Sequence, residues 1–297
     1  MASRSKAGGK SRATTQGTTA RSRKGAVAAA PKREHGRGKG AAQSAAPPTE
    51  SAREKTTRPV GPVVDPLPPG RRPDGRILFG RTVTLEPVDP ALHARDLFDA
   101  SHDGRDPEGT LWTYMAFGPW SGFAAFEAWL QAFAADRELC TYSIVPRASR
   151  KPAGMASYMN MRPAAGVMEI GNIWLAPRLQ RTREATESIF LLMRHAFEDL
   201  GCRRLEWKCD ALNAPSRAAA ERFGFTFEGI FRKHMIVKGR SRDTAWFSII
   251  DEEWPRLRAG FLAWLADDNF DAEGRQKRAL TACFPENELR TESAKHA

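Results

Sequence analysis

The residues whose types and spacing could do chemistry are concentrated in a short turn, Arg178-Leu-Gln-Arg-Thr-Arg183, which carries three arginines. The turn stands between a predicted strand, Glu169–Leu175, and a predicted helix, Glu184–Leu200. A helix start offers free backbone N–H groups and the positive end of the helix dipole. The positive charge of three arginines is unfavourable beside that positive end. A bound anion is therefore favoured over the alternative of a helix start exposed only to solvent. We therefore expect a phosphate site here, and a pyrophosphate suits it.

A second helix is predicted from Asn213 to Gly224, with polar side chains in its first turn. Asn213 is a good N-cap, Pro215 is tolerated near the start, and Gly224 favours a helix end. The Ser216 hydroxyl lies in the same first turn. Capping alone would account for Asn213, and local capping at the third helical position would account for Ser216.

Acidic residues on two predicted strands are candidate proton acceptors. Glu169 opens the strand before the arginine-containing turn, and a carboxylate can act as a general base. A solvated strand end is the alternative for this residue. In the strand over 203–210, Glu206, Lys208 and Asp210 alternate with apolar residues. Glu206 and Asp210 are reserve proton acceptors, whereas for Lys208 we expect an ordinary half-exposed strand position.

Cysteines and histidines show no spacing typical of a site. The four cysteines, at positions 140, 202, 209 and 283, include no C-x-x-C pair. A buried strand cysteine such as Cys209 is more often inert than nucleophilic. No pair of histidines has metal-ligand spacing, so we predict no metal site. Reduced thiols in a cytoplasmic protein are the simplest account of the cysteines.

Together these segments resemble the GCN5-related N-acetyltransferase (GNAT) superfamily, in its RimJ/RimL-like branch. GNAT enzymes hold the pyrophosphate of coenzyme A in a turn of the pattern Gln/Arg-x-x-Gly-x-Gly/Ala. The segment Gln180-Arg-Thr-Arg-Glu-Ala185 matches it at both ends and has Arg183 at the usual central glycine. Similar proteins also carry Asn-x-x-Ser, as in Asn213–Ser216, and a Gly-Phe at the end of that helix. The resemblance covers roughly residues 77 to 265.

The resemblance implies an acetyl-CoA-dependent N-acetyltransferase that releases coenzyme A. A primary amine, either a protein N-terminus or a small amine such as a drug or polyamine, would attack the thioester directly in a ternary complex. Glu169 would receive the proton and Ser216 would support the thiolate, while an N–H near Trp174 would polarise the thioester carbonyl. The implied cofactor-binding residues are Ile173, Trp174, Leu175, Gln180, Arg181, Thr182, Arg183, Glu184, Ala185, Asn213 and Ser216.

A second hypothesis follows from two departures from the family pattern. Arg183 replaces the usual glycine, and Ala220 stands where many GNAT enzymes have a tyrosine that protonates the departing thiolate. These departures suggest the alternative of a catalytically weak or inactive acyl-CoA-binding module, tethered to nucleic acid by a basic tail.

The elements that must position these residues read as an α+β fold. Before the central segment we expect a strand over 81–86, helices over 90–100 and 123–136, and a hairpin of strands 139–146 and 152–161. After it we expect a hairpin of strands 225–238 and 242–250 and a helix over 251–265. This order predicts a mostly antiparallel, twisted sheet with helices on both faces. A doubly wound parallel sheet would need regular strand–helix alternation.

Charge and composition divide the chain of 297 residues into three parts. Of 46 Lys and Arg and 35 Asp and Glu, residues 1–60 hold 14 and 3, which leaves 32 of each sign for the remainder. We predict a disordered basic Ala/Gly/Ser/Pro-rich tail and linker over 1–75, an acetyltransferase domain over 76–266, and a polar C-terminal tail over 267–297. Residues 1–60 could contact nucleic acid or ribosomes non-specifically. No apolar run is long enough to span a membrane.

Overall fold

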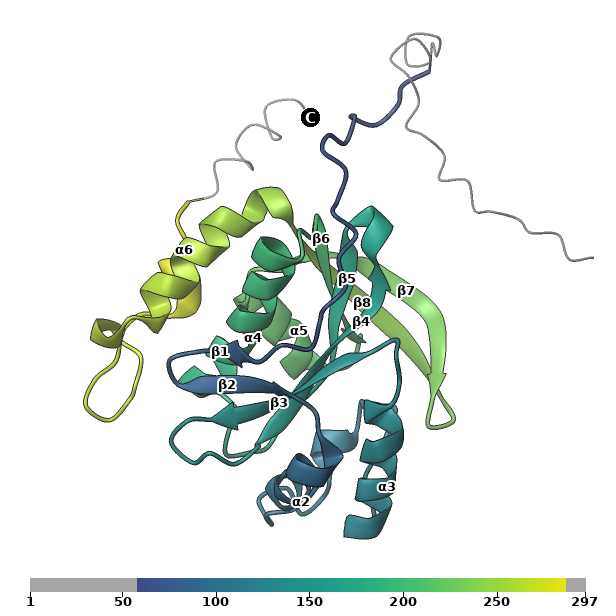
Figure 1. The fold of residues 1–297 in the computed structure, drawn as a ribbon, viewed down its shortest axis with the longest axis vertical. Coiled ribbons are helices and arrows are strands. Elements are labelled where there is room, and N and C mark those ends of the chain that lie inside the picture. The colour runs from purple at the N-terminus through teal and green to yellow at the C-terminus, as the bar shows by residue number, and fades with distance from the viewer. Residues whose placement is uncertain (1–57, 287–297) are drawn as a thin grey trace, which may run out of the picture. The chain divides into compact units, whose positions relative to one another are not determined.

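The computed structural model describes residues 58–286, which form an eight-stranded sheet in the order β1-β2-β3-β4-β5-β6-β8-β7 (Figure 1). The predicted tail up to residue 57, with most of its proposed polyanion contact, and residues 287–297 lie outside this range. Neighbouring strands are antiparallel except β5 and β6, which are parallel. The strands are β1 Leu78–Phe79, β2 Val83–Pro87, β3 Cys140–Pro146, β4 Gly154–Arg162, β5 Val167–Leu175, β6 Arg204–Asp210, β7 Thr226–Val237 and β8 Arg240–Ile250.

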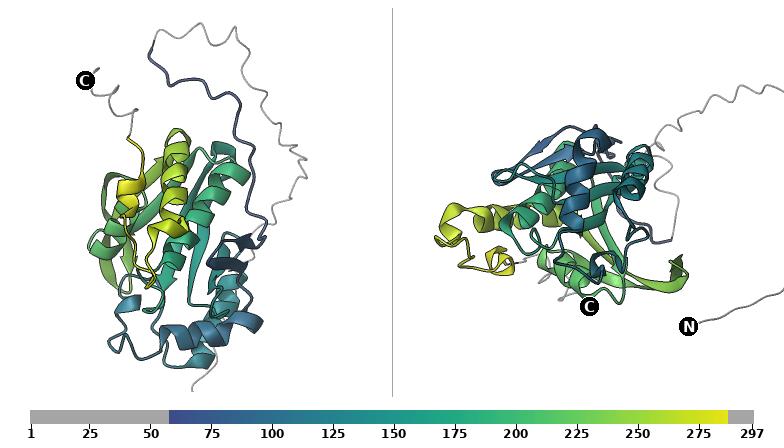
Figure 2. Two further views of the ribbon diagram at one scale, coloured as in Figure 1. Left: turned by 90° about the vertical axis from the view of Figure 1, so that its left-hand side faces the viewer. Right: turned by 90° about the horizontal axis from the view of Figure 1, so that it is seen from below.

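Helices cover both faces of the sheet, which confirms the predicted α+β class. Met155 and Ala156 are neighbours on β4 and so point to opposite faces. Met155 packs in one apolar cluster with residues of α2 and α3, and Ala156 packs in the other with residues of α4 and α6. Figures 1 and 2 show α4 beside α6, with α2 and α3 at the opposite side of the sheet. The helices are α2 Pro90–Ser101, α3 Phe123–Ala134, α4 Arg183–Arg194, α5 Ala214–Arg222 and α6 Trp254–Leu265.

The helix α4 is the central helix, because it is held between the sheet and α6. The Tyr158 hydroxyl of β4 donates to the Leu192 carbonyl at 2.5 Å, and the Phe190 ring stacks on Phe261 of α6 with centroids 5.2 Å apart. The helix continues as a π-helical turn, His195–Asp199, to the end that the sequence predicts. Among the described residues, no helix is long and apolar enough to cross a membrane.

Two β-bulges interrupt the pairing of β4 with β5, and each contains an asparagine with left-handed backbone geometry. Between Met159↔Glu169 and Arg162↔Val167, β4 has one extra residue, and Asn160 there has φ 48°. Further along the pair, the extra residue is on β5, where Asn172 has φ 51°. Asparagine tolerates this conformation better than most residues. Since a bulge changes which face later side chains occupy, the sequence alternation alone did not predict either one.

The segment after Asp267 is packed more closely than the polar C-terminal tail predicted over 267–297 would suggest. Leu280 and Cys283 are buried, and the Phe284 ring packs edge-on against Phe261 of α6. Gly260 permits this close approach, since a Cβ atom there would lie 2.3 Å from the Phe284 ring. Residues 267–286 thus extend the core beyond the boundary at 266.

Replacing Leu280 with alanine tests this packing. Leu280 is 1% exposed, so Leu280→Ala should lower the free energy of unfolding by about 2–5 kcal/mol through lost burial and a new cavity. Leu262→Ala on α6 is the matched control, because Leu262 is 44% exposed. Urea denaturation of both variants would measure the effect, and equal, small changes would show that the C-terminal segment does not contribute to the core.

Candidate active site

The pairing of β5 with β6 ends at Glu169, and from there the two strands separate. The parallel register runs Val167↔Arg204, Met168↔Leu205 and Glu169↔Glu206, although β5 continues to Leu175 and β6 to Asp210. Beyond Glu169, β5 pairs with β4 alone within the described part of the chain. Its backbone groups on the β6 side are therefore available to a ligand, and an extended amide-containing ligand would suit such an edge.

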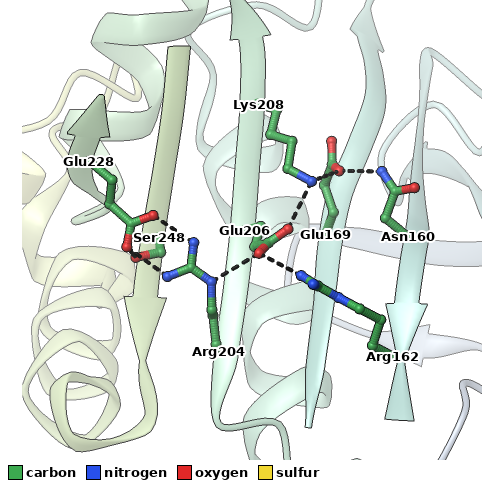
Figure 3. A network of polar contacts seen from close by, with 8 residues as sticks. All are labelled: Asn160, Arg162, Glu169, Arg204, Glu206, Lys208, Glu228 and Ser248. Carbon is green, nitrogen blue, oxygen red and sulfur yellow. Dashed lines mark hydrogen bonds and ion pairs between the residues drawn. The ribbon is translucent and has the colours of Figure 1, made fainter. Parts of the chain in front are cut away.

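A buried ion cluster lies at the point of separation (Figure 3). The Lys208 ammonium is 2.9 Å from Glu169 Oε2 and 2.8 Å from Glu206 Oε2, and it lies 3.9 Å from the centre of the Trp246 ring. Asn160, from the β4 bulge, donates its side-chain amide to Glu169 Oε2 at 2.6 Å. Glu169 and Glu206 are only 4% and 2% exposed, so both carboxylates depend on these partners.

The cluster extends across β6 to β8 and β7 through Arg204. The Arg204 guanidinium donates to Glu206 Oε1 at 2.9 Å and to both oxygens of Glu228 at 2.6 Å, and Arg162 donates to Glu206 Oε1 at 3.0 Å. Burial raises the pKa of Glu206, but the hydrogen bonds from Lys208 and Arg204 outweigh it and hold that pKa below its usual value. The hydrogen bonds from Arg204 likewise lower the pKa of Glu228 against a smaller effect of burial.

The turn before α4 has the features of an anion site. Thr182 caps the helix and accepts from the Ala185 N–H at 3.1 Å. Among the described residues, the backbone N–H groups of Arg181, Arg183 and Glu184 have no hydrogen-bond acceptor. Arg181 is exposed at φ 62°, and its side chain has no hydrogen bond or ion pair to any residue of 58–286. This turn can receive a phosphate on free N–H groups and one free guanidinium.

Two of the three arginines in the turn are directed elsewhere. Arg183 donates to the Leu265 carbonyl and to Asp267 Oδ1, the latter at 2.8 Å, and its guanidinium lies 4.4 Å from the Phe270 ring centre. Arg178 donates to the Pro152 carbonyl at 3.2 Å. Arg183 thus ties the start of α4 to the C-terminal segment instead of leaving its charge free.

Gln180 also turns back onto the protein. Its side-chain amide donates to the Leu175 carbonyl at 3.0 Å, which engages one of the β5 backbone groups expected to meet a ligand. Ile173 and Leu175 are partly exposed, whereas Trp174 is 2% exposed and packs on Trp112 with ring centroids 5.3 Å apart. The Trp174 side chain is therefore part of the core, and only its backbone can contact a ligand.

Ser216 lies on the opposite face of the sheet from Glu169. Its hydroxyl oxygen accepts from the Trp207 indole N–H at 3.0 Å, and its N–H donates to Asn213 Oδ1 at 3.1 Å, which confirms the predicted cap. Trp207 follows Glu206 on β6 and points to the other face. Glu169 and Ser216 therefore flank the separation of β5 and β6 from its two sides. Burial raises the pKa of the nearby Cys209 thiol, which makes it a poor nucleophile.

The sequence reasoning missed two members of the site. The expectation of a half-exposed Lys208 is wrong, because its side chain is 11% exposed and holds both carboxylates. Nothing in the sequence pattern indicates Asn160. The alternation of polar and apolar residues indicates that Glu206 and Lys208 share one face of the strand. The sequence does not indicate that Glu169 lies opposite Glu206, because this depends on strand register. Asp210, a reserve proton acceptor in the sequence, caps the following turn through the Leu212 N–H.

Within residues 58–286, His, Cys, Asp and Glu side chains form no group of three that could hold a metal ion.

Comparisons with known proteins agree on one family. The family described as "Acetyltransferase (GNAT) domain" matches residues 82–226. A crystal structure of a GCN5-related N-acetyltransferase from Brucella melitensis is 46% identical with a TM-score of 0.70, and the match covers 72% of this chain and 96% of that one. The crystal structure of a probable acetyltransferase of the GNAT family from Chromobacterium violaceum ATCC 12472 is 38% identical with a TM-score of 0.60, and the match covers 71% of this chain and 100% of that one.

A curated Bacillus subtilis (strain 168) relative, "Putative ribosomal N-acetyltransferase YdaF", is 33% identical over 101 residues. The match covers 34% of this chain and 55% of the relative, so this chain spans about half the length of that protein.

The ion cluster should make part of the stability depend on pH. The folded-state pKa of Glu228 is below its unfolded value, so its contribution is present above that value and lost as pH falls through the lower one. The difference in unfolding free energy between the wild type and Glu228→Gln should thus be largest above the ordinary glutamate pKa of 4.5 and shrink as pH falls below it. Urea denaturation at several pH values checks this. Glu221→Gln, at an exposed residue of α5, is the control, and a difference independent of pH would contradict the role of Arg204.

Proposed function

Because the chain belongs to the GNAT acetyltransferase family, we propose that it transfers the acetyl group of acetyl-CoA to a primary amine and releases coenzyme A. The family expected from the sequence is confirmed, and the ribosomal N-acetyltransferase name of the Bacillus relative supports the RimJ/RimL-like branch. The observation that carries the proposal is the separation of β5 from β6 at Glu169, with a carboxylate on one face and the Ser216 hydroxyl on the other.

The chain offers acetyl-CoA two kinds of contact. The pyrophosphate would be held by the N–H groups of Arg183 and Glu184 and by the Arg181 guanidinium, which has no polar partner among the described residues. The β5 backbone beyond Glu169 would pair with the pantetheine amides, and an N–H near Trp174 would polarise the thioester carbonyl. The Asn213 side chain serves the helix cap, which leaves cofactor contacts near it to backbone groups and to Ser216.

The acid–base roles of Glu169 and Ser216 follow from their positions on opposite faces of the sheet. Acetyl-CoA supplies an activated acyl group: the new N–C bond forms as the C–S bond breaks. An amine that enters as ammonium must lose two protons in all, one before attack and one after it. Glu169, or a water it holds, takes a proton from the nitrogen, and one proton reaches the thiolate while the other leaves to solvent. The Ser216 O–H, whose oxygen already accepts from Trp207, would donate to the sulfur as its charge develops.

The acceptor is best sought among protein N-termini. The name of the Bacillus relative supports a ribosomal protein. The acceptor must reach Glu169 on the face that carries Lys208 and Trp246, beside the β7–β8 hairpin. At the far end of this hairpin Lys238 donates to the Trp112 carbonyl in the α2–α3 connection at 2.7 Å, so these two segments meet.

A cytoplasmic location of the protein stays a prediction, which rests on the four unpaired cysteines.

Turnover tests the proposal. Coenzyme release from acetyl-CoA should be seen with the full chain and one class among N-terminal peptides, polyamines and aminoglycosides. Glu169→Gln should lower kcat by about 10²–10⁴-fold. Ser216→Ala should lower it by about 10–100-fold, the effect of one hydrogen bond to charge of ~1.5–3 kcal/mol. Glu221→Gln and Ser121→Ala are exposed controls. Heat stabilisation by acetyl-CoA without turnover on any acceptor would favour the non-catalytic binding module.

The arginine assignment has its own test. Arg181→Ala should weaken coenzyme A binding by about 10–100-fold, since it removes a positive charge beside the pyrophosphate. Arg150→Ala is a matched control, because Arg150 is also an exposed arginine with left-handed geometry, at φ 54°. Arg181→Gly separates the side chain from backbone strain. Isothermal titration calorimetry measures binding, and equal affinities for the two alanine variants would remove Arg181 from the site.

A further inference from the structure

Lys208 spans the opening between β5 and β6. It lies on β6 two residues beyond the last pair with β5, so its backbone belongs to the separated part of the strand. Its ammonium nevertheless returns to Glu169 on β5, at 2.9 Å, and also contacts Glu206, at 2.8 Å (Figure 3). Trp246, opposite Lys208 on β8, lies beneath the charge. The ammonium is therefore fixed from three sides at the place where a proton acceptor is needed.

Without this ammonium, Glu169 and Glu206 would be two buried carboxylates opposite each other on adjacent strands. Strands lie about 4.8 Å apart, and like charges directly opposite each other are destabilising. Two carboxylates that share a site keep a proton between them, because one of the two pKa values rises strongly. Burial acts in the same direction. A protonated Glu169 cannot accept a proton from an amine.

The other charged groups around the cluster cannot replace Lys208. Arg162 and Arg204 contact Glu206 through Oε1, and Glu228 and Ser248 lie on the far side of Arg204. Asn160 is neutral, and His234 packs against the Trp246 ring at 5.9 Å and hydrogen-bonds Thr244 rather than either carboxylate. Lys208 is thus the one cation within the described residues that contacts Glu169. Glu169 Oε1 has no hydrogen-bond partner in that range, so one carboxylate oxygen is free for the acceptor amine or a water.

We propose that Lys208 is a positioning residue of the reaction, which keeps Glu169 ionised and fixes its carboxylate with one oxygen towards the opening. The inference rests on the proposed function, because it specifies how the proton acceptor of that reaction is kept ready. It also explains why a lysine from the separated strand is held against two carboxylates rather than left in solvent.

The test compares Lys208→Met, Lys208→Arg and the double variant Lys208→Met/Glu206→Gln in the full chain. The first readout is the 13C NMR titration of the Glu169 carboxyl carbon, assigned with Glu169→Gln, which requires no turnover. The second is the pH profile of kcat with one acceptor for all proteins, so that differences between profiles report the enzyme. Heat unfolding shows whether each variant is folded.

We expect the Glu169 titration and the acid limb of kcat to move up by about 1–3 pH units in Lys208→Met. Lys208→Arg should restore the wild-type limb. Removal of the second carboxylate in the double variant should move the titration back towards the wild-type value. The proposal would be overturned if a folded Lys208→Met kept the wild-type titration of Glu169 and the wild-type acid limb of the kcat profile, even if its activity fell at every pH. A wild type without any acetyl transfer would instead contradict the proposed function, while the NMR titration would still decide the role of Lys208.

Discussion

The last parallel pair of the sheet, Glu169 opposite Glu206, is the constraint on which the site depends. Two buried carboxylates on adjacent strands need cations, and Lys208, Arg162 and Arg204 supply them from β6 and β4. Beyond this pair the strands separate. The Asn172 bulge then directs Trp174 into the core, while the β5 backbone stays open on the β6 side. The ion cluster therefore lies at the last pair between β5 and β6, at the point where the opening between these two strands begins.

The elements that position this site could be predicted from the sequence because their signals are local. The alternation before Pro87, the Asp89 cap of α2 and the Asn213 cap of α5 each involve a few neighbouring residues. The bulges could not be predicted, because one extra residue changes no composition and is visible only in the register of two strands. The burial of Lys208 depends in the same way on which residue of β5 faces Glu206. For the same reason the roles of Glu169 and Ser216 came from the family resemblance and not from the pattern.

The presence of Arg183 at the position of the usual glycine in the coenzyme turn has a structural explanation that the sequence does not reveal. Its side chain lies on the Phe270 ring and pairs with Asp267, and Asp267 also pairs with Arg81. These contacts hold the C-terminal segment beside the start of α4. The backbone N–H of Arg183 remains available at the helix start, so the substitution removes neither the dipole nor the donors on which phosphate binding relies. Arg181, with its left-handed backbone, is the arginine of this turn whose side chain has no hydrogen bond or ion pair within residues 58–286.

A crystal structure of the protein with coenzyme A is the most direct test of this account. We expect the pyrophosphate to lie on the N–H groups of Arg183 and Glu184, and the pantetheine arm to run along β5 beyond Glu169. The sulfur should then lie between the face that carries Glu169 and the face that carries Ser216. A coenzyme bound away from the β5–β6 opening, or one whose sulfur is remote from both residues, would contradict the account.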